Sequence, residues 1–312
     1  MGIQITKTGP GAFFLCQPGL ISKVLAVVGM SDSNGVDTPT GTKSGALGAD
    51  LDGTPFHETL SYRTVIGMLM FLSANTRPSI AFAVHQAARF SHSPRASHAL
   101  AVKRILCYLK RTQDKGFYLR PNSSHTVDCY VDADFAGNFS AELPDNPESV
   151  KSRTGYLILY RGSPLLWLSK LQSLIALSTM EAEYVALSQA MQDLIPIREI
   201  LKEVLSVVFS VSDTIQYQTH SKAFNDVSHP ASSVPASKVY EDNAACLKFA
   251  STGQLSPRTK HIGVPYHWFR SKVIALDIQI LPVSTTDQLA DIFTKGLPNP
   301  TVESLCRLLM GW

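Results

Sequence analysis

The stretch YVDADF, residues 130–135, ends an apolar run typical of a buried strand and places two aspartates at that end. A carboxylate buried without a partner costs several kcal/mol, so buried acids are usually paired, hydrogen-bonded or bound to a metal. Asp132 and Asp134 are therefore expected to have partners, or to share a metal with further carboxylates that the fold brings to the same place.

Short apolar runs surround this stretch and predict an antiparallel meander. They are TVDCYVDADF (126–135), TGYLILYRG (154–162), PLLWLSK (164–170) and SLIALS (173–178). A helical pattern follows directly, and Ser178 and Glu181 have the spacing of a capping box at its start. We expect Pro196 to divide or kink this helix.

The rest of the chain continues with strands and helices in alternation. Residues 210–237 are polar and mixed, so we expect a loop, apart from a possible strand near Ile215–Gln218. The further elements expected are a strand at Ser237–Glu241, a helix from Asn243, a helix over Lys260–Leu276, a strand at Ile278–Val283 and a final helix opened by Thr285. This order predicts an α/β domain with a mixed sheet over residues 125–312.

Residues 1–120 have a different organisation. Residues 62–120 have helical periodicity interrupted by proline, which predicts a small helical segment. Residues 31–61 are rich in Gly, Asp, Thr and Pro and predict a linker across a surface. Residues 1–30 are too few for a core of their own and predict two strands and a short helix, at Ile3–Thr6, Ala12–Cys16 and Pro18–Val28.

One helix of the helical segment carries a basic stripe beside an apolar one. The basic residues are Lys103, Arg104, Lys110 and Arg111. A solvated helix face is the simpler interpretation, and contact with nucleic-acid phosphates is the functional alternative. The net charge of +3, from 28 basic and 25 acidic residues, is too small to decide between them.

Composition predicts a soluble protein of the cytoplasm or nucleus, with no membrane partner. No apolar run approaches the roughly 18 residues that a membrane span requires. The five cysteines form no CxxC pair and their number is odd, which favours free thiols over a disulfide framework and argues against structural zinc.

Four acids occupy ends of the expected elements, about fifty to sixty residues apart in the sequence: Asp132, Glu183, Asp242 and Asp291. Each alone has a simpler explanation, since a strand-end aspartate is usually a turn residue and Asp291 can pair with Lys295 one helical turn later. Together they are more telling, because two divalent metals that bridge a phosphate need several carboxylates.

The motifs around these acids resemble a known family. YVDADFAG, SRTGYLILYRGSPLLWLSKLQSLIALSTMEAEYVALS, YEDNAACLKFA, LSPRTKHIGVPYHWFR and DQLADIFTKGLP resemble the ribonuclease H domain that closes the polyprotein of copia-type LTR retrotransposons. Upstream, QPGLISKVL and the stretch from YRTVIGMLM to AVKRILCYLK resemble the end of a reverse transcriptase and the connection to its nuclease. The resemblance covers nearly the whole chain.

This resemblance implies a ribonuclease H-like fold with a five-stranded mixed sheet, preceded by the small helical connection segment. It also implies hydrolysis of the RNA strand in an RNA–DNA hybrid with two Mg²⁺ ions, for which Mn²⁺ can substitute, and a reading of the RNA 2′-hydroxyl. The missing polymerase part of the polyprotein is a further implied partner. The implied metal-binding catalytic acids are Asp132 of DADFAG, Glu183 of EAEY, Asp242 of EDNAA and Asp291 of LADIF, with Asp134 and Glu181 as close competitors.

The chain also departs from the family pattern. Cellular ribonucleases H often have a histidine shortly before the last acid, and PVSTTDQLAD has none; His261 of TKHIG is better explained by a structural role. No YVDD-like turn precedes Gly9, so polymerase activity is not expected. Two rival hypotheses remain: a non-catalytic remnant or nucleic-acid-binding module, and, ranked lowest, an integrase-like DNA enzyme, whose HHCC segment is missing.

Overall fold

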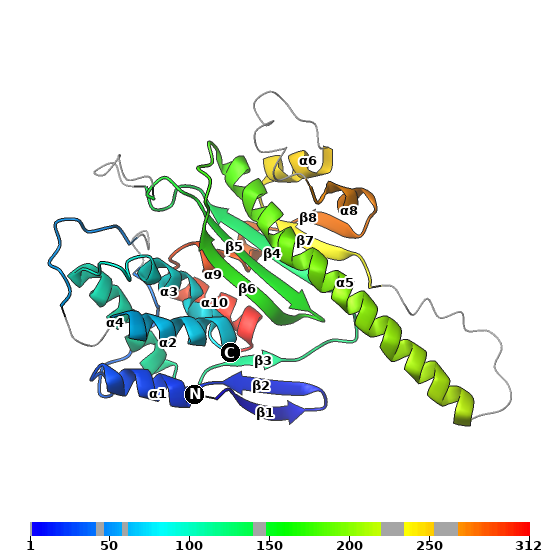
Figure 1. Ribbon diagram of the computed structural model, residues 1–312, viewed down its shortest axis with the longest axis horizontal. Helices are drawn as coiled ribbons and strands as arrows, with labels where there is room; N and C mark the ends of the chain where they lie inside the picture. The colour runs from blue at the N-terminus through cyan, green and yellow to red at the C-terminus, as the bar shows by residue number, and fades with distance from the viewer. Residues whose placement is uncertain (1, 42–46, 58–61, 140–147, 220–233, 253–267) are drawn as a thin grey trace.

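The computed structural model describes residues 2–41, 47–57, 62–139, 148–219, 234–252 and 268–312 (Figure 1). The N-terminal elements are β1 (Gln4–Gly9), β2 (Ala12–Cys16), α1 (Pro18–Val27), α2 (Tyr62–Asn75), the 3₁₀ turn η1 (Pro78–Ile80), α3 (Ala81–Ala88), α4 (Ala96–Arg111) and β3 (Phe117–Leu119). The C-terminal elements are β4 (Val127–Asp134), β5 (Arg153–Tyr160), β6 (Ser163–Leu171), α5 (Thr179–Thr219), β7 (Ser237–Glu241), α6 (Ala244–Thr252), α8 (Arg270–Ile274), β8 (Ile278–Pro282), the 3₁₀ turn η2 (Thr285–Asp287), α9 (Asp291–Thr294) and α10 (Asn299–Met310).

The main sheet has five strands in the order β6-β5-β4-β7-β8. Strand β5 pairs antiparallel with both β4 and β6, whereas β7 pairs parallel with both β4 and β8. The sheet is therefore mixed, because the hairpin strands run antiparallel and each later strand returns through a helix. The prediction of an α/β fold of the ribonuclease H type with a five-stranded mixed sheet is confirmed.

Helices cover both faces of this sheet (Figure 1). Tyr156 and Ile158 of β5 belong to the core beneath α5, and Leu157 between them packs with Phe293 of α9 on the opposite face. Since successive strand residues point to opposite faces, a strand covered on both sides needs apolar residues throughout. The unbroken run GYLILY, residues 155–160, meets that need.

Helix α5 begins at the predicted Ser178 cap, but the Glu181 carboxylate folds back to the residue before Ser178. The Ser178 hydroxyl accepts a hydrogen bond from the Glu181 N–H at 3.2 Å, and the Glu181 carboxylate folds back to the Leu177 N–H at 2.8 Å. The helix continues through Pro196 to Thr219, so Pro196 does not divide it. The expected loop over residues 210–219 and the possible strand at Ile215–Gln218 are therefore wrong. The run SLIALS, residues 173–178, is not a strand either; it leads into the helix, and its larger apolar side chains are exposed.

The C-terminal end is divided more than the sequence suggests. The predicted final helix is three elements, η2, α9 and α10, separated by Gln288–Ala290 and Lys295–Pro298. Of the predicted helix Lys260–Leu276, residues 260–267 and the candidate His261 lie outside the described residues, and α8 covers Arg270–Ile274. Asp291 is consequently the first residue of a short helix rather than an interior residue of a long one.

Residues upstream of the main sheet form a second core. Apolar side chains of α1 pack with those of α2, α3 and α4, for instance Ile21 with Leu69 and Leu109. Strand β3, which the sequence did not predict, joins β1 and β2 in a small antiparallel sheet with β2 in the centre. A third cluster joins the two halves, because Phe117 of β3 packs with Leu157 of β5 and Phe293 of α9.

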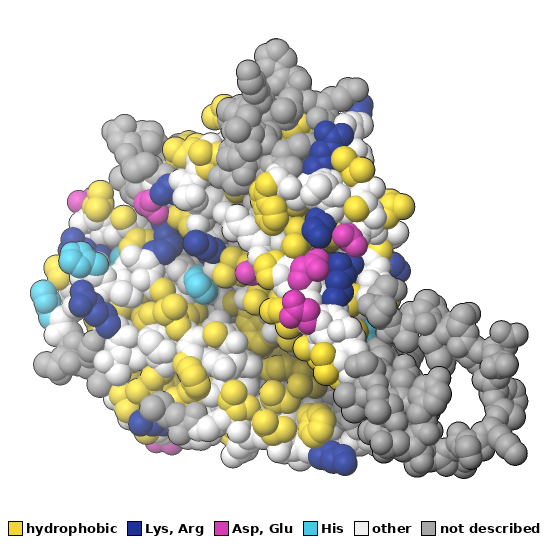
Figure 2. Space-filling model, turned by 45° about the vertical axis from the view of Figure 1, so that its right-hand side comes forward, with side chains coloured by type: hydrophobic (Ala, Val, Ile, Leu, Met, Phe, Trp, Pro, Cys, Tyr) yellow, Lys and Arg dark blue, Asp and Glu magenta, His cyan; other side chains and the backbone are white. Residues whose placement is uncertain are grey.

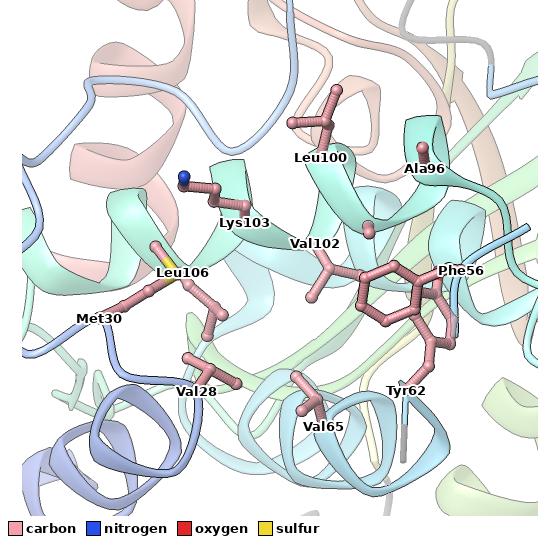
Figure 3. A pocket seen from close by; sticks show the side chains of 11 residues that line it. Val28, Met30, Phe56, Tyr62, Val65, Ala96, Leu100, Val102, Lys103 and Leu106 are labelled. Atoms are coloured by element: carbon pink, nitrogen blue, oxygen red, sulfur yellow. The ribbon is translucent and has the colours of Figure 1, made fainter. Parts of the chain in front are cut away.

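An apolar pocket lies in this upstream part, between the end of α1, α2 and α4 (Figure 3). It has a volume of about 440 Å³, and apolar side chains such as Met30, Val65 and Leu106 line it, together with Lys103. Among the described residues, none of the four candidate acids lines it. The pocket is therefore separate from the four acids that the sequence predicts as metal ligands.

The surface carries charges of both signs. On the face shown in Figure 2, lysine and arginine side chains lie scattered among acidic, polar and apolar ones, without one continuous basic band in its coloured part. Each helix within the described residues is too short or too polar to cross a lipid bilayer.

Candidate metal centre

Three of the four predicted acids meet beside the ends of β4 and β7, two inner strands of the main sheet. Asp132 lies near the end of β4, and Asp242 directly follows β7. These strands are parallel neighbours in which Tyr130 pairs with Tyr240, so each acid lies two residues beyond a matched pair. Glu183 projects from the first turns of α5, which packs on β4. One carboxylate oxygen from each of Asp132, Glu183 and Asp242 lies within 4.8 Å of the other two.

Asp291 joins this group through Asp132, whose charge helps to raise the pKa of Asp291. The Lys295 ammonium lies 2.8 Å from Asp291 Oδ1 and 3.9 Å from Asp132 Oδ2. The Thr294 hydroxyl also donates a hydrogen bond to Asp132 Oδ2. The pairing of Asp291 with Lys295, the simpler explanation of this acid, is thus present, and the same ammonium group also approaches Asp132.

Two contacts fix α9 beside the end of β4. The fully buried Gln288 donates a hydrogen bond to the Val131 carbonyl at 2.8 Å and accepts one from the Ala290 N–H at 3.2 Å. Gly155 of β5 is the register partner of Asp132, and a Cβ there would lie 2.6 Å from Thr294 Cγ2. Glycine at this position therefore lets α9 approach the sheet closely.

Burial makes these carboxyl groups weaker acids. It raises the pKa of Asp132, which Lys295 and Thr294 partly oppose. Burial and the Asp132 charge raise the pKa of Asp291 to about 7. Burial, Glu241 and Asp132 raise the pKa of Glu183 well above its ordinary value. Like charges packed in a desolvated site attract protons, or a cation that replaces them.

The residues fit a hard divalent cation. Glu183 is 6% exposed, and its Oε2 atom is buried with no hydrogen-bond partner among the described residues. A buried carboxylate oxygen without a partner is costly, and a cation would satisfy it. Because the donors are carboxylate oxygens, without histidine or cysteine, the set suits Mg²⁺ or Mn²⁺ better than zinc.

Sequence reasoning missed a fifth acid in the same place, Glu241. It is completely buried, and its Oε1 accepts a hydrogen bond from the Asn243 N–H at 3.0 Å. Burial, with a contribution from Asp242, raises its pKa to about 8. The alternation of side chains along β7 could have revealed Glu241, because Ser237, Val239 and Glu241 lie on the same buried face of the strand.

Asp134 and Glu181, the alternative candidates for the metal-binding acids, lie outside the group of Asp132, Glu183 and Asp242. Asp134 ends β4 on the same face as Asp132, and burial and the Asp132 charge raise its pKa, but it is outside the group of three. Glu181 caps the start of α5 through the Leu177 N–H.

The predicted basic stripe on α4 is partly engaged by the upstream linker. Arg104 donates a hydrogen bond to the Thr38 hydroxyl at 2.8 Å, and Arg111 lies 2.7 Å from the Asp37 carboxylate. Lys103 lines the apolar pocket, and Lys110 is half-buried in the last turn of α4. Phosphate contact by these four residues stays a prediction, and two of the four already have partners in the upstream linker.

The chain is similar to polyproteins of plant transposons. It is 31% identical to the retrovirus-related Pol polyprotein from transposon TNT 1-94 of Nicotiana tabacum, over 100% of this chain and 21% of that protein. It is 30% identical to those from transposons RE2 and RE1 of Arabidopsis thaliana, over 98% and 95% of this chain and 18% of each of those proteins.

The chain thus spans about a fifth of the length of these relatives. No protein-family model and no solved structure matches it. The identity of about 30% extends over nearly the whole chain and agrees with the motifs quoted from the sequence. The chain belongs to the Pol polyproteins of copia-type LTR retrotransposons.

Proposed function

We propose that this chain is the ribonuclease H part of a copia-type Pol polyprotein and hydrolyses the RNA strand of RNA–DNA hybrids with divalent metal. The observation that carries the proposal is the convergence of Asp132, Glu183 and Asp242 within 4.8 Å at one end of two parallel strands. The family supports it, because the acids stand in motifs that resemble its nuclease domain.

The four acids have distinct roles in this proposal. Asp132, Glu183 and Asp242 would hold one cation, and Asp132 with Asp291 would hold the second. The bound Mg²⁺ ions would supply a polarised water for attack on phosphorus and charge stabilisation for the departing 3′ oxygen. Thr294 and Gln288 are positioning residues: Thr294 orients the Asp132 carboxylate, and Gln288 fastens α9 to β4.

A comparison of which nucleic-acid strands the chain hydrolyses tests this function. The purified chain would be incubated in Mg²⁺ with a hybrid labelled on both strands, and in parallel with double-stranded RNA and double-stranded DNA of the same sequence. We expect metal-dependent fragments from the RNA strand of the hybrid alone, and none in EDTA.

Other outcomes point to the rival functions. Cleavage of double-stranded DNA would support an integrase-like enzyme. A folded chain that cleaves nothing in Mg²⁺ or Mn²⁺ but shifts the hybrid in a gel would be a non-catalytic nucleic-acid-binding module, and the proposal would be wrong.

A further inference from the structure

Asp132, Glu183, Glu241, Asp242 and Asp291 are called the carboxylate cluster. The two sides of this cluster differ in how their negative charge is balanced. Lys295 contacts Asp132 and Asp291, whose side chains are only 4% and 10% exposed. Within the described residues, no ion pair reaches Glu183 or Asp242, and Glu183 Oε2 has no hydrogen-bond partner. The Asp132–Asp291 side therefore already has the Lys295 ammonium as its counter-ion, and no positive charge of the described residues pairs with Glu183 or Asp242.

The position of Lys295 is fixed by the fold. It directly follows α9, whose Thr294 is anchored to Asp132 and whose Phe293 is completely buried. The Lys295 side chain is 36% exposed, so its ammonium group reaches the acids from the solvent side. Because the side chain is already 36% exposed, the ammonium group can move into water without unfolding the core.

We propose that Lys295 is a built-in competitor for the second divalent ion, holding the Asp132–Asp291 side until a metal displaces its ammonium group. This inference rests on the proposed function, since it assigns Asp132 and Asp291 to that ion. The first ion binds on the Asp132–Glu183–Asp242 side without displacing any described cation. The second ion binds more weakly, because it must remove an ammonium group that lies 2.8 Å from Asp291.

Coulomb's law supports a sizeable effect. An ammonium group a few ångströms from a divalent ion in a partly buried site repels it by an amount that corresponds to about tenfold or more in affinity. Removing this charge should therefore tighten metal binding, although it also removes the counter-ion of the metal-free protein. An ordinary structural ion pair predicts only a loss of stability.

The first test is calorimetric titration of the purified chain with Mn²⁺ alone. Lys272→Met is the matched control, since Lys272 is also 36% exposed and lies 3.3 Å from Glu199 and 3.7 Å from Asp277, two carboxylates outside the cluster. We expect Lys295→Met to bind the second ion about tenfold or more tightly than wild type, with Lys272→Met and Lys295→Arg close to wild type.

The second test uses the wild-type chain, so it does not depend on the folding of a variant. Lysines would be acetylated with an N-hydroxysuccinimide ester with and without saturating Mg²⁺, and their modification quantified by mass spectrometry. We expect Mg²⁺ to increase the labelling of Lys295 and to leave Lys272 unchanged.

The possible failures are distinguishable. Unchanged Mn²⁺ affinity in a folded Lys295→Met, or unchanged Lys295 labelling in Mg²⁺, would overturn the competition while leaving the proposed function in place. Loss of binding in Lys295→Met with binding retained in wild type would do the same. If neither protein binds Mn²⁺, both the inference and the proposed function are wrong.

Discussion

Burial and mutual repulsion dominate the chemistry of the single residues in the carboxylate cluster. Asp132, Glu183, Glu241 and Asp291 all have raised pKa values, and burial is the first cause for each. The Lys295 ammonium opposes this for Asp132 and Asp291 without cancelling it. The metal-free fold therefore carries a cost at neutral pH, which a bound cation would offset.

This cost predicts a pH dependence of stability. The pKa of Glu241 rises from 4.5 to about 8 on folding. Between those values the folded state keeps a proton that the unfolded state has lost, so the contribution of Glu241 to stability falls as pH rises. We expect Glu241→Gln to gain stability relative to wild type between pH 5 and pH 8.

Urea denaturation in EDTA at several pH values measures this difference. The advantage of Glu241→Gln should grow with pH, at no more than about 1.4 kcal/mol per pH unit. Parallel pH profiles for the two proteins would show that Glu241 is ionised in the folded state and would contradict the account.

The close contact at Gly155 gives a second prediction. A Cβ there would lie 2.6 Å from Thr294 Cγ2, 2.8 Å from Phe293 Cβ and 3.1 Å from the Ala290 carbonyl oxygen. Gly155→Ala should push α9 away from β5, cost about 1–3 kcal/mol of stability and reduce RNA cleavage, because Asp291 begins α9.

Thermal unfolding and hybrid cleavage measure both effects. Gly67→Ala in α2 is the control, since a Cβ there meets no atom within 4 Å and alanine favours a helix by up to about 1 kcal/mol. A Gly155→Ala chain as stable and active as wild type would show that α9 does not depend on this contact.

Among the elements, helix α3 supports the hairpin of β4 and β5. Gln86 of α3 donates a hydrogen bond to Asn138, which follows β4, at 2.9 Å. It also accepts hydrogen bonds from Arg153 of β5 and from Arg89, each at 3.1 Å. Arg153 in turn is the register partner of Asp134. A helix of the upstream segment thus contacts strand β5 and the segment that follows β4, the strand that carries Asp132.

Replacing Gln86 by leucine should weaken this support. Arg153 and Asn138 would each lose a buried partner, so we expect a loss of about 1–3 kcal/mol in the free energy of unfolding and slower cleavage. Gln113→Leu is the control, because its side chain makes an exposed hydrogen bond to Ser22. Equal denaturation midpoints for the two variants would argue against this support.

Most elements were predictable where the local pattern is strong, as in GYLILY or in the Ser178 cap. Asp132, Glu183 and Asp242 could be predicted as a group because each lies near the end of an element with a strong local pattern. The division of the last helix could not be foreseen, because tertiary contacts of Gln288 and Gly155 decide it. Strand β3 was missed because its three residues become a strand only by pairing with β2.

At the scale of the whole molecule, the upstream half and the main sheet share a core. Phe117 of β3 is 5% exposed and lies edge-on to Trp167 of β6, with ring centroids 5.8 Å apart. The Trp167 indole also donates a hydrogen bond to the Ser73 carbonyl in α2 at 2.8 Å. The composition of the two halves gave no sign of this contact, since long-range packing leaves no local pattern.

The shared core predicts that damage at Phe117 affects both halves together. Phe117→Ala should cost about 3–5 kcal/mol and lower the denaturation midpoints of both halves equally. Phe13→Ala in neighbouring β2, where the ring is 36% exposed, should cost much less. Urea unfolding followed by hydrogen exchange in both halves measures this, and destabilisation confined to the upstream half would contradict a shared core.

The proposed metal-dependent centre at Asp132, Glu183 and Asp242 makes hydrolysis of the RNA strand in hybrids depend on Asp132. Its most direct test is the single-turnover rate of hybrid cleavage in Mg²⁺ for wild type, Asp132→Asn and Asp128→Asn. Asp128 lies on the same strand but accepts a hydrogen bond from the Lys238 N–H at 3.1 Å, away from the cluster. We expect cleavage to be lost in Asp132→Asn and kept in Asp128→Asn; equal rates in all three proteins would show that these acids do not form the nuclease centre.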